Sequence, residues 1–179
     1  MSKAILRPLQ ITDLDNIMTW VNDPEVVRNF QNFDMKITKK AEKKFLEKIL
    51  ASKNDRMFAV ETETGEYLGN AGIHQIHSKN RLGRLALIIG NKQHWGKGYA
   101  QSAVKVLLQY AFNVYDLNKV WLMTFKENDK NKHIYRKMGF RKEGLLLQEY
   151  ADRYGKFHDI VRMAMLRKEY KQLKAGGKL

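Results

Sequence analysis

The segment from Leu87 to Ala100 constrains the fold more than any other part of the sequence. It reads Leu-Ile-Ile-Gly-Asn-Lys-Gln-His-Trp-Gly-Lys-Gly-Tyr-Ala, and its start belongs to an almost entirely apolar run from Arg84 to Gly90. Such a run is typical of a strand buried on both faces, and here it leads through a glycine loop into an amphipathic helix. Glycines allow close backbone approach, and loop amides converge there with the positive end of the helix. The segment therefore predicts an anion site that suits a pyrophosphate.

Two other phosphate-binding glycine loops do not fit this segment. It contains no Gly-Lys-Ser or Gly-Lys-Thr, which the nucleoside-triphosphate loop requires. The dinucleotide pattern Gly-x-Gly-x-x-Gly fails as well, because position 101 is Gln. A simple tight turn is the remaining alternative for a bare Gly-x-Gly.

The rest of the chain predicts one mixed α/β domain over residues 1–170, followed by a basic, frayed tail at 171–179. Strands are expected near residues 6–9, 57–61, 67–74, 84–90, 119–125, 143–147 and 159–166. Helices are expected near residues 12–21, 24–27, 41–50, 99–112 and 128–138, with Gly139 as a left-handed cap.

Composition excludes several classes of protein. The 179 residues include no Cys, which excludes disulfides, thiolate metal sites and a Cys nucleophile. No apolar run approaches the length that spans a bilayer, so no membrane association and a cytoplasmic location are expected. The net charge is +14, and the last 54 residues hold 15 basic and 7 acidic side chains. This surface favours an anionic partner, although scattered lysines also serve solubility alone.

Two blocks of sequence resemble the GCN5-related N-acetyltransferase (GNAT) superfamily. Trp95-Gly96-Lys97-Gly98-Tyr99-Ala100 is similar to its acyl-CoA loop, with Trp95 in place of the usual Gln or Arg. In the second block Asn128, Tyr135 and Gly139-Phe140 have the family spacing. The resemblance covers roughly residues 5–170 and is nearest to ribosomal-protein N-terminal acetyltransferases and spermidine N-acetyltransferases.

The resemblance implies a mixed, mostly antiparallel twisted sheet flanked by helices, with a splayed strand pair holding the acyl-CoA. Acetyl-CoA is then the cosubstrate, bound by backbone and side-chain groups of both blocks. The residues implied are Leu87, Ile88, Ile89, Trp95, Gly96, Lys97, Gly98, Tyr99, Ala100, Asn128, Lys130 and Tyr135. Packing in the core, a helix cap or a solvated face are the alternative roles for these residues.

Tyr135 is the expected catalytic acid, because a phenol has a pKa close enough to that of a thiol to protonate the departing CoA thiolate. The general base is a second group to assign. Related enzymes often use a Glu on the strand before the loop, and this chain has Arg84 there. His74 titrates in the right range and is the expected base, with His77 as an alternative.

The acceptor is expected to contact Phe30, Phe33, Arg84 and Tyr150, in loops that flank the thioester in this family. Residues 28–37 hold one carboxylate, Asp34, whereas a polyamine needs several. We therefore expect direct, ternary-complex transfer to a primary amine such as a protein N-terminus or an amino sugar. A spermidine-type acetyltransferase and a non-catalytic nucleic-acid- or ribosome-binding module are the alternatives, with nucleic acid the less favoured partner. No metal is implied, and a homodimer is left open.

Overall fold

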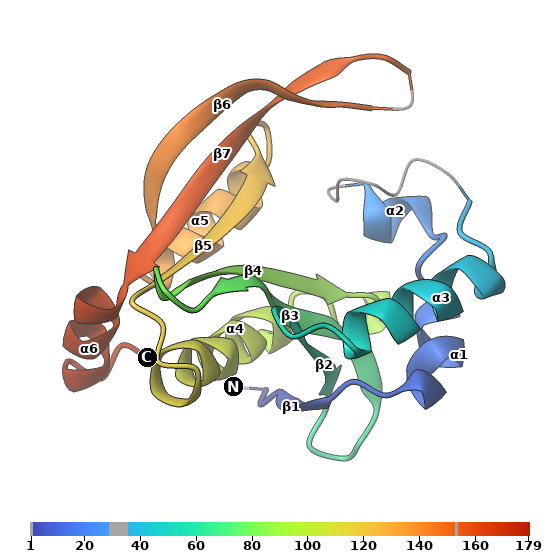
Figure 1. Cartoon of the computed structure of the whole chain (residues 1–179), viewed down its shortest axis with the longest axis horizontal. Coiled ribbons are helices and arrows are strands. Elements are labelled where there is room, and N and C mark those ends of the chain that lie inside the picture. Colours follow the sequence, from blue (N-terminus) through green and yellow to red (C-terminus); the bar gives the residue numbers. More distant parts are fainter. Residues whose placement is uncertain (1, 29–35, 153) are drawn as a thin grey trace.

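The computed structural model describes residues 2–28, 36–152 and 154–179, and a seven-stranded sheet dominates that part of the chain (Figure 1). The strand order is β1-β2-β3-β4-β5-β7-β6. All neighbouring strands are antiparallel except β4 and β5, which are parallel. The strands are β1 (Ile5–Pro8), β2 (Arg56–Glu61), β3 (Tyr67–His77), β4 (Leu82–Ile89), β5 (Lys119–Phe125), β6 (Arg141–Ala151) and β7 (Phe157–Leu166).

Helices cover both faces of the sheet. They are α1 (Leu14–Met18), α2 (Pro24–Val27), α3 (Lys39–Leu50), α4 (Tyr99–Gln109), α5 (Asp129–Lys137) and α6 (Arg167–Ala175). Short turns of other helix types occur at Ile11–Asp13, Lys92–His94 and Tyr110–Val114. The predicted mixed α/β fold with a mostly antiparallel sheet and flanking helices is confirmed.

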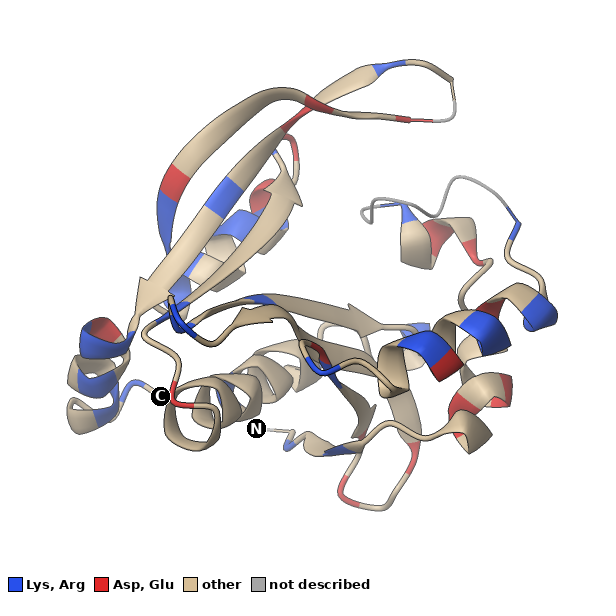
Figure 2. Ribbon diagram, viewed as in Figure 1, with Lys and Arg blue, Asp and Glu red and all other residues tan. Residues whose placement is uncertain are grey.

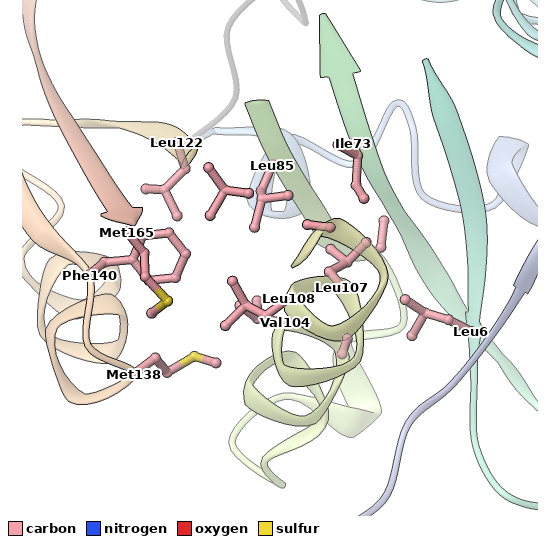
Figure 3. Packing of buried hydrophobic residues seen from close by; sticks show 14 of the residues in the cluster. Leu6, Ile73, Leu85, Val104, Leu107, Leu108, Leu122, Met138, Phe140 and Met165 are labelled. Atoms are coloured by element: carbon pink, nitrogen blue, oxygen red, sulfur yellow. The ribbon is translucent and has the colours of Figure 1, made fainter. Parts of the chain in front are cut away.

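The main hydrophobic core lies between α4 and the sheet. Val104, Leu107 and Leu108 form the apolar side of α4 and pack toward Leu85 of β4 and Leu122 of β5 (Figure 3). A second cluster lies on the opposite side of β2 and β3, where Ile17, Leu46 and Ala59 are fully buried. Alternate residues of each strand therefore point toward α4 or away from it.

Strands β4 and β5 separate soon after they meet. Their pairing covers only Leu82–Arg84 on β4 and Lys119–Trp121 on β5. Beyond those residues β4 stays paired with β3 as far as Ile89, and β5 stays paired with β7 as far as Phe125. The two strands have different partners and therefore diverge, which is the splayed pair that the family resemblance implies.

Several predicted boundaries are wrong: the helix expected at 12–21 is Leu14–Met18, and the strand expected at 67–74 runs to His77. Two others differ most. The strand expected at 143–147 extends over Arg141–Ala151, so β6 and β7 form a long hairpin that arches away from the rest of the sheet (Figure 1). The tail expected to fray from residue 171 instead continues α6 as far as Ala175, because Leu173 packs against the main core. Gly139 has a φ of +92°, as its predicted role as a left-handed cap requires.

Candidate active site

The glycine loop presents free amides at the start of α4. Gly96 and Gly98 have φ values of +79° and +91°, in the left-handed region that favours glycine. No side chain caps α4, and the amides of residues 97–101 donate no hydrogen bond to any other residue that the structure describes. A Cβ at either glycine would meet nothing within 4 Å, so the space before these amides is open. The arrangement can hold a pyrophosphate.

Contacts on both sides hold this loop in place. The Trp95 indole nitrogen Nε1 donates a hydrogen bond of 2.8 Å to the Ile89 carbonyl oxygen at the end of β4. Lys92 Nζ lies 2.7 Å from Asp23 Oδ2 and 3.1 Å from Glu25 Oε2, at the start of α2. The Trp95 side chain therefore ties the loop to the end of β4, a role that its place in the motif does not predict.

The backbone of β4 offers groups to the opening between β4 and β5. Ile88 pairs with Asn70 of β3, and its carbonyl oxygen points at β3, only 2.1 Å from where a Cβ on Gly69 would lie. Because backbone groups alternate along a strand, those of Leu87 and Ile89 face away from β3, toward the opening. Of the three predicted residues, Leu87 and Ile89 thus have backbone groups directed at the opening, and Ile88 does not. The Ile89 carbonyl also accepts the hydrogen bond from Trp95.

Asn128 has one hydrogen-bonding group in use and one free. Its Oδ1 accepts a hydrogen bond of 3.1 Å from the Asn131 amide and so caps α5. Its Nδ2 is buried and has no hydrogen-bond partner among the described residues. A buried donor without an acceptor is unusual, and the amide oxygens of a pantetheine would supply one. Lys130, two residues further along, is exposed.

Tyr135 of α5 lines a small pocket at the point where β4 and β5 diverge. The other lining residues are Leu85, Ala86, Leu87, Val104, Leu107 and Leu122. The tyrosine is partly exposed as a whole residue and packs edge-on against Phe140, with 5.8 Å between ring centroids. Burial of its hydroxyl group raises the pKa of Tyr135 to about 12. The phenol is therefore protonated at neutral pH and can donate a hydrogen bond into the pocket.

His74 of β3 is buried and paired with a carboxylate. Its Nδ1 lies 2.9 Å from Asp55 Oδ1, and a Cβ on Gly72 would lie only 2.5 Å from its Nε2. Burial lowers the pKa of His74, although the hydrogen bond to Asp55 opposes this shift. Asp55 also accepts a hydrogen bond of 2.6 Å from Ser52 Oγ. The neutral ring, with Nδ1–H donating to Asp55, leaves Nε2 as a proton acceptor.

Asp55 is the residue that sequence reasoning missed. Asp55 lies in the loop before β2, 19 residues before His74 of β3, and no local sequence pattern links the two. A bulge in β3 at Gln75, with a φ of +52°, places the Gln75 amide 3.3 Å from the same Asp55 oxygen. His77 is exposed beyond this bulge and has no such carboxylate partner in the described chain.

The predicted acceptor residues do not all come together. Arg84 of β4 lies directly opposite His74 in the β3–β4 pairing, and burial lowers the pKa of Arg84. Tyr150 lies on β6, where its ring contacts Phe125 edge-on at 5.6 Å between centroids. Phe30 and Phe33 lie outside the described residues.

Comparison with known proteins places this geometry in a family. The family model for the acetyltransferase (GNAT) domain matches residues 3–141. An N-acetyltransferase of unknown role from Bacillus licheniformis, p20, is 29% identical over 94% of this chain and 95% of its own length. Spermidine N(1)-acetyltransferase from Escherichia coli strain K12 is 33% identical over 92% of this chain and 87% of its own length.

A solved structure agrees with the sequence relatives. The spermidine N-acetyltransferase from Vibrio cholerae, in complex with CoA and spermine, superimposes with a TM-score of 0.86 at 27% sequence identity. The match covers 94% of this chain and 98% of that one. No helix in residues 2–28, 36–152 and 154–179 is long and apolar enough to cross a membrane. The chain belongs to the GNAT acetyltransferase family and is an N-acetyltransferase with acetyl-CoA as its cosubstrate.

Proposed function

We propose that this enzyme acetylates a primary amine of a neutral or anionic molecule, such as a protein N-terminus or an amino sugar, in one ternary complex. The observation that carries the proposal is the placement of Tyr135 and His74 around the diverging strands. Leu85 and Leu87 point toward α4, on the side where Tyr135 lies. Arg84 and its neighbour His74 point to the other side. The leaving thiolate and the incoming amine then have separate sides of the opening.

In the proposed reaction a bond forms between the amine nitrogen and the thioester carbonyl carbon, and the carbon–sulfur bond breaks. The amine nitrogen loses a proton to His74 Nε2, whose ring Asp55 orients through Nδ1. Tyr135 donates its phenolic proton to the sulfur as negative charge develops there. The tyrosinate then regains a proton from solvent, and the proton on His74 passes to solvent. Removing either group should cost a factor typical of general acid–base catalysis, about 10²–10⁴ in rate.

Polyamine acetylation is the second candidate, favoured by relatives that are named spermidine N-acetyltransferases. A polycation is best held by carboxylates that have no other cation partner. Near the opening, Asp55 does not stand free, because it already accepts hydrogen bonds from His74, Ser52 and the Gln75 amide. Glu143 lies within ion-pair distance of both Lys119 and Arg162. Arg84 adds a further positive charge. This distribution favours a neutral or anionic acceptor over spermidine.

The proposal is tested with a panel of amines and acetyl-CoA, with thiol release as the readout. The panel comprises ribosomal-protein N-terminal peptides, amino sugars and polyamines. The proposed function predicts higher kcat/KM for a peptide or an amino sugar than for spermidine. A clear preference for spermidine would replace it with the second candidate, and binding of CoA without turnover of any amine would contradict catalysis.

A further inference from the structure

We propose that Arg84 and Trp121 form a subsite for an anionic group, so that the acceptor is a primary amine that also carries a carboxylate or a phosphate. This inference rests on the proposed function, because it names the acceptor class of the same site. Nothing in the GNAT fold itself requires an anion there.

Both residues lie where an acceptor would approach. Arg84 on β4 pairs with Trp121 on β5, and this is the last pair before the strands diverge. Their neighbours Leu85 and Leu122 point into the α4 core, so Arg84 and Trp121 point to the other side of the sheet. Trp121 packs in neither hydrophobic cluster, although only 8% of its surface is exposed.

Both side chains carry a buried donor that lacks an acceptor. Arg84 Nε and Trp121 Nε1 are inaccessible to solvent and make no hydrogen bond within the described part of the chain. Buried donors are nearly always paired, so two unpaired ones on adjacent residues need an explanation. Arg84 remains partly exposed, so an incoming ligand can reach it. A carboxylate or phosphate offers several lone pairs. In the proposed subsite it meets the exposed part of Arg84 first and accepts from both buried donors once the Arg84 side chain turns and uncovers them.

The surrounding charges leave no carboxylate of the chain itself for this role. The Arg162 guanidinium lies over the Trp121 ring, 4.0 Å from its centroid. Glu143, the carboxylate beside them, lies 3.0 Å from Arg162 Nε and also pairs with Lys119. Lys119 and Arg162 thus share one carboxylate on the β6–β7 hairpin, along which both basic and acidic side chains lie (Figure 2). Arg84 has no ion-pair partner within the described residues, and the carboxylate that acts on it from a distance is Asp55. The three cations outnumber the two carboxylates, which favours an anionic group over an ammonium.

The subsite also limits the distance between the anion and the amine. Arg84 lies directly opposite His74, and the Cβ atoms of such a cross-strand pair are about 5 Å apart. His74 is the proposed proton acceptor for the amine. An acceptor that reaches both residues therefore carries its anionic group on the same small molecule as its amine, as short amino acids and amino-sugar phosphates do.

The test compares matched acceptors that differ in charge. β-Alanine is paired with β-alaninamide, and glucosamine 6-phosphate with glucosamine, so that the two arms separate a carboxylate from a phosphate. Each pair is assayed by thiol release with the wild type, Arg84→Gln and Lys79→Gln. Lys79 is exposed in the turn before β4, and its substitution removes the same net charge. Intrinsic amine reactivity cancels when the preference of each variant is compared with that of the wild type.

We expect the wild type to favour the anionic member of at least one pair, chiefly through KM. Arg84→Gln should reduce that preference about 10- to 100-fold, the range for a charge-assisted hydrogen bond, whereas Lys79→Gln should keep it. Arg84→Glu should shift the relative kcat/KM toward spermidine. Equal losses for charged and uncharged acceptors in Arg84→Gln, or a wild type that prefers spermidine, would overturn the subsite.

A binding measurement separates this inference from the proposed chemistry. N-acetyl-β-alanine and N-acetylglucosamine 6-phosphate are titrated into the CoA complexes of the wild type and Arg84→Gln. Weaker binding to Arg84→Gln supports the subsite even if no amine turns over. Missing turnover would contradict the proposed function and not the subsite. Equal affinity for both proteins would overturn the subsite, whatever the turnover.

Discussion

Arg84 and Trp121 form the last residue pair between the parallel strands β4 and β5. Past this pair each strand follows a different antiparallel neighbour, and an opening forms between them. The α4 side of the opening holds Tyr135 and apolar core residues. The other side holds His74, Arg84 and Trp121. One divergence in the sheet thus separates the side proposed for the leaving group from the side proposed for the amine.

The substitution Tyr135→Phe should lower kcat by about 10²–10⁴-fold and leave CoA affinity nearly unchanged. It removes the hydroxyl but keeps the ring that packs against Phe140. The wild-type profile should show no basic limb from this phenol below pH 10, because its pKa is about 12. Tyr110→Phe, at a tyrosine stacked on Phe58 away from the pocket, is the control. Equal kcat in both variants would remove Tyr135 from the mechanism.

The Asp55–His74 pair should define an acid limb in the pH dependence of kcat/KM. Because burial lowers the pKa of His74, the neutral base persists below the usual pH of about 6.5, and activity falls only below that value. In His74→Gln this limb should vanish, and in Asp55→Asn it should move to lower pH, because the hydrogen bond that raises the pKa is weakened. The proton on the acceptor amine titrates separately.

His77→Gln is the matched control for the pH experiment. This histidine is exposed beyond the bulge in β3, so its loss should leave the profile unchanged. An unaltered acid limb in His74→Gln would show that solvent or another group takes the proton.

Arg7 should make a large contribution to stability. Its Nη1 and Nη2 donate to Asp13 at 2.8 and 2.6 Å, and its Nε donates to Glu61 at 2.8 Å. The Asp13 side chain is 5% exposed, so Arg7→Ala strands a buried carboxylate. We expect a loss of about 3 kcal/mol in the free energy of unfolding, measured in urea. Lys39→Ala, which breaks the exposed pair with Asp15, should cost less than about 1 kcal/mol.

The stability difference between wild type and Arg7→Ala should depend on pH. Burial raises the pKa of Asp13, but hydrogen bonds from Arg7 and Gln10 outweigh it and keep the net value below the ordinary one. Stabilisation by a carboxylate with a lowered pKa is present above the unfolded value, near pH 3.9, and is lost as pH falls through the folded value. A difference that persists undiminished far below pH 3.9 would contradict the ion pair.

Local patterns in the sequence predicted the elements that carry the site, and long-range contacts explain what was missed. The glycine loop and α4 follow from residue spacing between Leu87 and Ala100. The partner of His74 does not follow from residue spacing, because the contact with Asp55 depends on the bulge in β3 and on the separate loop that holds Asp55. The unpaired Nε1 donor of Trp121 depends on the point where β4 and β5 diverge, and the sequence of either strand alone does not predict that point. The helix α6 was missed because its short polar stretch is held by tertiary contacts, those of Tyr170 and Leu173 with the core.

The central claim is that the amides around Gly98 bind the pyrophosphate of CoA, and thermal unfolding with CoA tests it most directly. At 100 times its dissociation constant, CoA should raise the wild-type Tm by about 5 to 10 °C. Gly98→Glu should abolish the shift. Gly65 is a turn glycine with a similar φ of +84° and equally open space, so Gly65→Glu carries the same backbone strain. This control variant should keep the CoA-dependent rise in Tm. A wild type without a shift, or equal losses in both variants, would contradict the account.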